Sequence, residues 1–280
     1  MKRALAALLL IPILLLSACS GWAVPETPGG EATPTPPASA SQSPAPEAPT
    51  QAPVPTPSPA PLEAPAPVWD RDSYAEDFTA DDGTLIFHAA MDLPRISNAD
   101  GVDAYEAVNA YYASAMVQYQ ADVADRASWA RDDYAVSASA GFPFFANTED
   151  STFDIAYDDG RLVSVRRTLA AVADGAEDAQ LFRTADSFDL STGRRLTFSD
   201  CFADPDTART RVKDTILGTG AQGITAVSLD VAFAPEHFYF TDQGMVFWYQ
   251  QGDLEGLAAP LEFTVPYQQL EGLFVSWINH

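Results

Sequence analysis

Apolar and polar residues alternate with the periods of regular secondary structure from residue 69 onward. Residues 78–87 alternate around Asp82-Gly83, which predicts two strands joined by an Asp-Gly turn. A helix is expected next, with Asn98 or Asp100 as its N-cap, because apolar residues then recur at helical spacing. These residues are Tyr105, Val108, Tyr112, Ala115, Met116, Tyr119 and Val123. We interpret the stripe as a core face that packs on a sheet.

Four segments with strand character are expected after this helix, at residues 133–142, 151–157, 161–172 and 178–190. Asp-Gly turns separate the last three, and hairpins in series indicate an antiparallel sheet. A second helix is expected after Asp204-Pro205, ending near Gly218 or Gly220, because an N-cap followed by proline is typical of a helix start. The remaining chain predicts strands near 226–233, 237–240, 245–250 and 261–265, and then a short helix at 267–274 that Pro266 opens.

The pattern therefore predicts an α+β fold, in which one long helix and shorter helices pack on antiparallel sheet. We place this domain at residues 69–280, with subdomains at about 71–190 and 191–280. A chain of this length can bury a substantial core.

The first residues are typical of an export signal. Lys2 and Arg3 precede an uncharged run, residues 4–16, that is too short to span a bilayer as a mature helix. The run ends in Leu-Ser-Ala-Cys at residues 16–19, which resembles a lipobox, the bacterial motif for lipid attachment to cysteine. We interpret residues 1–18 as a lipoprotein signal peptide and Cys19 as the lipid attachment site, since two acyl chains give stable anchoring. A secretory peptide with an incidental cysteine is the alternative.

Residues 19–68 are predicted to form a disordered tether behind the lipidated cysteine. Pro, Ala, Thr, Ser and Glu dominate it, with 15 prolines between Pro25 and Pro67 and neither Lys nor Arg. Such a segment buries too little apolar surface to fold, and its prolines allow a reach of at most about 150 Å. These features place the domain on the outer face of a bacterial cytoplasmic membrane.

The net charge of the chain restricts the classes of molecule that it can bind. The chain has 39 acidic and 15 basic residues, a net of -24. Residues 71–280 have 34 acidic and 13 basic residues, a net of -21. Nucleic acids and anionic lipid surfaces would be repelled, and cations and basic proteins attracted, although solubility alone also accounts for such charge. Lipidation of Cys19 would leave Cys201 unpaired, so we expect no intrachain disulfide.

Catalytic motifs are not found. Residues 79–82, Thr-Ala-Asp-Asp, resemble the metal motif of polysaccharide deacetylases, but the chain has only three histidines and no His-x-x-x-His. We therefore interpret this motif as a hairpin turn. Cys201 and His237 could form a thiol pair, but an acidic neighbour disfavours the thiolate.

Acidic groups do not match a calcium loop either. They occur at Asp81-Asp82, Asp132-Asp133, Asp158-Asp159 and around Asp200, Asp204 and Asp206, without the spacing of an EF-hand. We interpret these carboxylates as caps and solvated surface. We therefore predict no catalytic residue, no cofactor and no metal site, and a protein that is not an enzyme.

Two stretches, residues 187–202 and 238–274, carry a family resemblance. Phe188-Asp189-Leu190, Thr192-Gly193 and Ser199-Asp200 form one part, and Val265-Pro266-Tyr267 with Leu270 the other. Here the chain resembles the RsiV/PdaC-type extracytoplasmic family, the domain shared by a lysozyme-sensing anti-sigma factor and a peptidoglycan deacetylase's non-catalytic N-terminal region. The resemblance covers about residues 75–278 and implies a long helix packed on antiparallel sheet. Two turns differ from the family pattern, at residues 174–177 and 251–256, so it predicts fold better than ligand.

The resemblance implies a non-catalytic domain that binds or senses, and together with the predicted lipid anchor it predicts a membrane-anchored binding or sensing module at the cell envelope. A lysozyme-like or other cationic envelope protein is the partner it suggests. Exposed aromatic residues would anchor such a partner. The candidates are the exposed members of a set of five, most of which would alternate into a core if these segments are strands: Phe238, Tyr239, Phe247, Trp248 and Tyr249. Because no residue would cross the membrane after cleavage, sensing would work through a further protein. A peptidoglycan-modifying enzyme or accessory domain is the alternative, and the ligand-binding residues and the oligomeric state stay open.

Overall fold

A computed structural model describes residues 64–173, 175–221, 224–254, 257 and 259–278. The predicted signal peptide, Cys19 and most of the predicted tether lie outside the described residues. No helix in the described part combines the length and the apolar character that a membrane span requires.

The larger sheet has six strands in sequence order. They are β1 (Trp69–Thr79), β2 (Leu85–Ile96), β3 (Asn147–Asp158), β4 (Leu162–Val172), β5 (Gln180–Asp189) and β6 (Arg194–Arg195). The predicted Asp-Gly hairpin joins β1 to β2, and β3, β4 and β5 are antiparallel as expected. The pair β2 and β3 is parallel, which the hairpin pattern did not predict. A helix connects these two strands and brings β3 back in the direction of β2.

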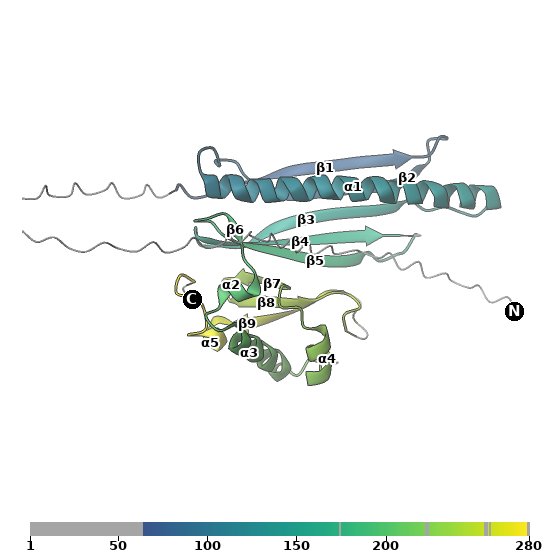
Figure 1. Ribbon diagram of the computed structural model, residues 1–280. Helices are drawn as coiled ribbons and strands as arrows, with labels where there is room; N and C mark the ends of the chain where they lie inside the picture. The colour runs from purple at the N-terminus through teal and green to yellow at the C-terminus, as the bar shows by residue number, and fades with distance from the viewer. Residues whose placement is uncertain (1–63, 174, 222–223, 255–256, 258, 279–280) are drawn as a thin grey trace, which may run out of the picture. The chain divides into compact units, whose positions relative to one another are not determined.

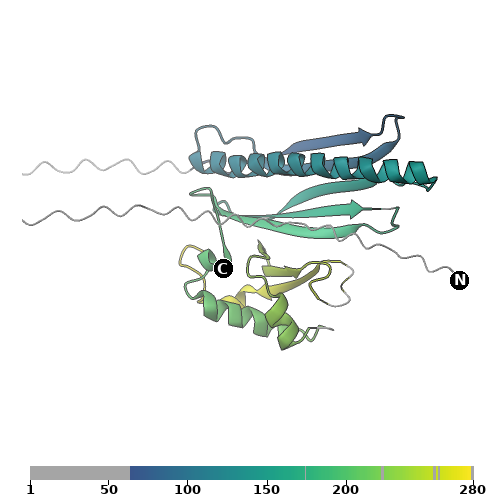
Figure 2. The ribbon, with the colours of Figure 1, turned by 45° about the vertical axis from the view of Figure 1, so that its right-hand side comes forward.

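The long helix α1 (Asp103–Ala140) packs on this sheet, mainly against β2. It runs along β1 and β2 in Figures 1 and 2. Most of the predicted stripe is buried, and Ala115 and Met116 are partly buried in the same core cluster. At 1.5 Å per residue its 38 residues span about 57 Å.

Both ends of α1 differ from the prediction. The helix continues through residues 133–140, where a strand was expected, and Gly141 ends it with a left-handed φ of 68°. Tyr134 stabilises this extension, because its ring packs on Phe144 with centroids 5.1 Å apart. At the start, Val102 is the N-cap and no side chain caps the helix. Asn98 instead accepts a hydrogen bond from the backbone N–H of Val68, at 2.8 Å.

The C-terminal part contains a three-stranded antiparallel sheet and four short helices. They are α2 (Phe198–Cys201), α3 (Pro205–Gly218), α4 (Ala226–Ala232), β7 (Phe238–Thr241), β8 (Gly244–Tyr249), β9 (Leu261–Pro266) and α5 (Tyr267–Leu270). The prediction for α3 is confirmed, since the Asp204 carboxylate accepts from the Thr207 N–H at its N-cap. The last helix ends at Leu270, four residues earlier than expected.

The strand expected at residues 226–233 is the helix α4. Thr225 and Ser228 form reciprocal side-chain to backbone hydrogen bonds at its start. This capping box satisfies the first N–H groups and decides the local structure, although the valines of this segment favour a strand.

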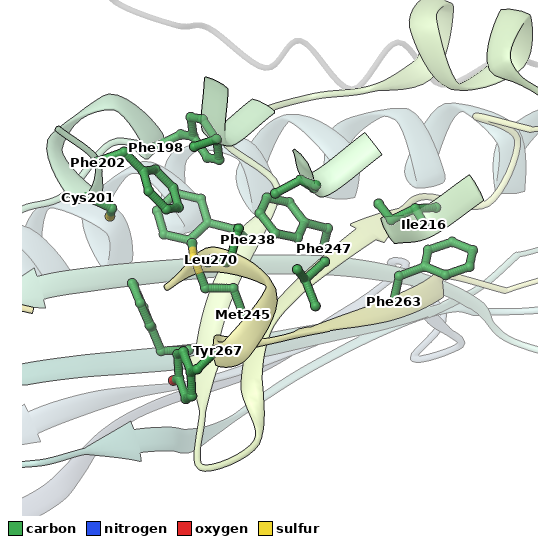
Figure 3. Packing of buried hydrophobic residues seen from close by; sticks show 14 of the residues in the cluster. Phe198, Cys201, Phe202, Ile216, Phe238, Met245, Phe247, Phe263, Tyr267 and Leu270 are labelled. Atoms are coloured by element: carbon green, nitrogen blue, oxygen red, sulfur yellow. The ribbon is translucent and has the colours of Figure 1, made fainter. Parts of the chain in front are cut away.

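The small sheet is packed on both faces. One face, with Phe238 and Phe247, joins α2, α3 and α5 in a core cluster (Figure 3). The other face, with Tyr239 and Trp248, packs on Ala185 of the larger sheet. The described residues therefore form an α+β fold, as predicted.

Candidate binding surface

The five aromatic residues expected to anchor a partner are all buried. Each of Phe238, Tyr239, Phe247, Trp248 and Tyr249 is at most 3% exposed. The expectation that some of them are exposed is therefore wrong. Their alternation reflects a sheet that is covered on both faces, and they stabilise the fold.

Cys201 and His237 do not form a thiol pair. Cys201 lies fully buried beside Phe202 in the core (Figure 3), and its Sγ donates a weak hydrogen bond to the Thr197 carbonyl at 3.4 Å. Burial raises the pKa of this thiol far above its usual range. His237 stacks on Trp248 with ring centroids 5.0 Å apart, and burial lowers its pKa. The thiol therefore stays protonated and has no base beside it among its hydrogen-bond partners in the described chain.

Several of the acidic groups singled out in the sequence accept hydrogen bonds at turns and helix starts, whereas Asp132 and Asp133 lie exposed within α1. Asp82, in the Thr-Ala-Asp-Asp motif, accepts from the Thr84 N–H at 3.0 Å and from the Tyr134 hydroxyl. Asp159 accepts from the N–H of Leu162, and Asp200 accepts from the N–H of Thr197, the N-cap of α2. Among the described residues no three carboxylate, histidine or cysteine groups converge as a metal site would require.

A buried ionic network ties α1 to the sheet. Asp186 of β5, 2% exposed, accepts from Arg167 at 2.8 Å, from Arg195 at 2.7 Å and from the Tyr111 hydroxyl at 2.6 Å. Burial alone would raise the pKa of Asp186, but the two guanidinium groups hold it below its usual value. Sequence reasoning missed this network, because its members come from three strands and a helix. Its hydrogen bonds are made within the fold, so we assign it to stability.

Large apolar side chains are exposed at the C-terminal end of α1. Trp129, Val136, Phe142 and Phe145 are 57%, 67%, 69% and 55% exposed. We call these four residues the distal patch. Monomers rarely expose a contiguous group of large apolar side chains without a functional reason.

Backbone geometry limits how far apart the members of the distal patch can lie. Trp129 and Val136 lie seven residues apart, so they share one side of the helix and are about 10 Å apart along it. Beyond the left-handed Gly141, the N–H of Phe142 donates to the Ser137 carbonyl at 2.9 Å and turns the chain back onto the last helical turn. Phe145 follows within three residues, at most about 11 Å away.

Three loops gather around the distal patch. The hydroxyl of Tyr134 reaches Asp82 in the β1–β2 turn, and the ring of Phe145 lies against Gly175 in the β4–β5 turn. Among the described residues of these turns and of the α1–β3 loop, 80–84, 173, 175–179 and 141–146, four are acidic and none is basic. They are Asp81, Asp82, Glu177 and Asp178. The distal patch is thus apolar, with acidic turns on either side.

The described chain enters the domain at the opposite end of α1. The Pro65 carbonyl accepts from the hydroxyl of Tyr105, in the first turn of the helix, at 2.6 Å. The Asn98 side chain bonds the backbone of Ala66 and of Val68. The length of α1 therefore separates this entry from the distal patch.

Solved structures share this architecture. A DUF3298 family member from Bacteroides fragilis superposes with a TM-score of 0.59 over 75% of this chain and 94% of that chain, at 15% identity. The chain has the DUF3298 fold. A DUF3298 family protein from Pseudomonas aeruginosa matches with a TM-score of 0.51 over 76% of this chain and 96% of that one, at 13% identity. No protein-family model and no curated protein matches the chain. DUF3298 is the RsiV/PdaC-type domain, so the fold agrees with the resemblance found in the sequence.

Proposed function

We propose that the protein is a lipoprotein, anchored through Cys19 to the outer face of a bacterial cytoplasmic membrane, and that it acts there as a non-catalytic binding or sensing module. The observation that carries this proposal is the DUF3298 fold behind a lipobox-like segment and a proline-rich stretch. We propose membership of the RsiV/PdaC-type family on the same ground.

The burial and the hydrogen bonding of the candidate catalytic groups favour a binding function over a catalytic one. The Cys201 thiol is buried with a raised pKa, and the conspicuous carboxylates are engaged at turns and caps. The distal patch, by contrast, offers exposed aromatic surface, which is typical of interfaces. A peptidoglycan-modifying enzyme is the alternative, and peptidoglycan hydrolysis or deacetylation by the purified full-length chain, lost on Asp82→Asn, would establish it.

The partner that we propose is a cationic envelope protein, with a lysozyme-type muramidase as the sharpest candidate. A net charge of -21 over residues 71–280 would steer a basic protein toward the domain and raise its association rate. Sensing would then pass through a further protein in the membrane.

Membrane fractionation tests the anchor. Wild-type protein should pellet with membranes and carry an acyl-modified Cys19 in mass spectrometry, whereas Cys19→Ala should be released. If wild-type Cys19 carries no acyl group and the variant still pellets with membranes, the anchor is wrong.

Titration with lysozyme tests the partner. The full-length chain in detergent would be titrated at low salt and near 0.5 M salt, where exposed charges are screened over roughly 4 to 5 Å. Saturable binding that persists at high salt supports a specific interface. Binding confined to low salt means nonspecific attraction and removes lysozyme as the partner.

A further inference from the structure

We infer that the distal patch is the docking surface of the domain and that its occupant is a basic protein, which contacts the four apolar side chains while its positive charges face the acidic turns. This inference rests on the binding function proposed above and assigns it a place in the fold. Neither the sequence resemblance nor the shared fold supplied that place.

The apolar part gives the surface its contact area. Three of its four members are aromatic, and an aromatic side chain presents roughly 150–250 Å² when fully exposed, so the distal patch offers on the order of 400 to 500 Å². Trp129 and Phe142 are suited to be central contacts, because a few large aromatic residues carry most of the energy of an interface. The helix and the left-handed turn at Gly141 fix their backbone, which lowers the entropy lost on docking.

The acidic turns beside the distal patch determine which kind of partner can dock there. A second copy would bring its own four acidic turn residues against these four, so self-association through this surface is disfavoured. An anionic lipid surface is disfavoured for the same reason. A protein with basic residues around an apolar contact satisfies both features, because its charges complement the turns while its apolar atoms cover the aromatic side chains.

The position of the surface agrees with a tethered receptor. The chain enters the domain beside Tyr105, and the distal patch lies at the other end of a helix about 57 Å long. A partner docked there is held away from the point where the tether begins.

Site-specific photo-crosslinking in the intact envelope tests the inference. The full-length chain would carry benzoylphenylalanine at position 142, or at Val231 of α4 as the control, which is 84% exposed and lies outside the distal patch. We expect position 142 to crosslink one basic protein, identified by mass spectrometry, and position 231 not to do so. Trp129→Ser in the same chain should reduce the product at least about tenfold, since loss of a central aromatic contact weakens binding by roughly 30-fold.

The outcomes separate the site from the function. A basic protein that crosslinks at position 231 but not at position 142, or a product unchanged by Trp129→Ser, leaves the binding function standing and overturns the site. Crosslinks from position 142 to a second copy, to lipid or to an acidic protein also overturn it. If neither position yields a protein and lysozyme does not bind in titration, both proposals fail. Because Trp129 is largely exposed, its substitution should leave the circular dichroism spectrum unchanged.

Discussion

Replacing Asp186 by asparagine removes one charge from the network between α1 and the sheet and keeps the size of the side chain. Arg167, whose side chain is 16% exposed, then has no countercharge at Nη2, and Arg195 loses its partner at Nε. Removing one partner of a buried ion pair costs about 3–5 kcal/mol, because the other charge stays buried without compensation. The Tyr111 hydroxyl loses a charged acceptor as well, but its share belongs to the same network and does not add in full.

Urea unfolding of the full-length chain, followed by circular dichroism, measures this loss. A domain of this kind has a free energy of unfolding of about 5–15 kcal/mol, so Asp186→Asn should lower the urea midpoint strongly with little change in slope. The matched control is Asp230→Asn. Asp230 pairs with a single cation, Lys213 at 2.6 Å, and its side chain is 68% exposed, so the loss of its charge should cost less than about 1 kcal/mol. If the two variants unfold at the same midpoint, the network contributes little, and the reasoning from burial is refuted.

Three further outcomes are expected. The stability difference between wild type and Asp186→Asn should be constant between neutral pH and about pH 5, because the folded pKa is lowered and the carboxylate's contribution is fully present above its unfolded pKa. The difference should shrink as the pH falls from the unfolded pKa through the folded pKa, and a decline already above about pH 5 in a urea series would contradict the direction of the shift. Gly193→Ala should lower the melting temperature more than Gly83→Ala does. Both glycines have a left-handed φ, but a Cβ at Gly193 would lie 2.4 Å from the Ala104 carbonyl oxygen, whereas Gly83 faces open space. Equal melting temperatures of the two variants would contradict this prediction. The Cys201 thiol should resist maleimide at pH 8 in the folded chain and react in urea, and rapid labelling without denaturant would show that the core is open there.

The parts of the fold that the sequence predicted well are those that local chemistry decides. The Asp82-Gly83 hairpin and the helix after Asp204-Pro205 depend on turn and cap residues that act within a few positions. The two wrong strands, at residues 133–142 and 226–233, contain residues of mixed propensity. In the first, contacts of Tyr134 with Phe144 and Asp82 extend the helix, and the Asp82 contact crosses some fifty residues of sequence that no local pattern reveals.

The candidate surface was harder to predict for a related reason. Alternating aromatic residues in β7 and β8 suggested exposed anchors, but periodicity does not tell whether one face or both faces of a sheet are covered. Val136, Phe142 and Phe145 of the distal patch lie in or just after the segment that was expected to be a strand, and Trp129 lies four residues before it. Gly141, followed by Phe142, was the available signal, because a glycine after a helical run is typical of a helix end.

The edge strand β1 has a consequence for the protein at high local density. On one side β1 pairs with β2, and in the described chain its other side has no strand beside it, so it could act as a template for strand addition. Its eleven residues include Asp70, Asp72, Glu76 and Asp77 against a single arginine. A second copy pairing edge to edge would bring like charges within about 5 Å, which is destabilising. Copies crowded on one surface would thus be kept from joining their sheets.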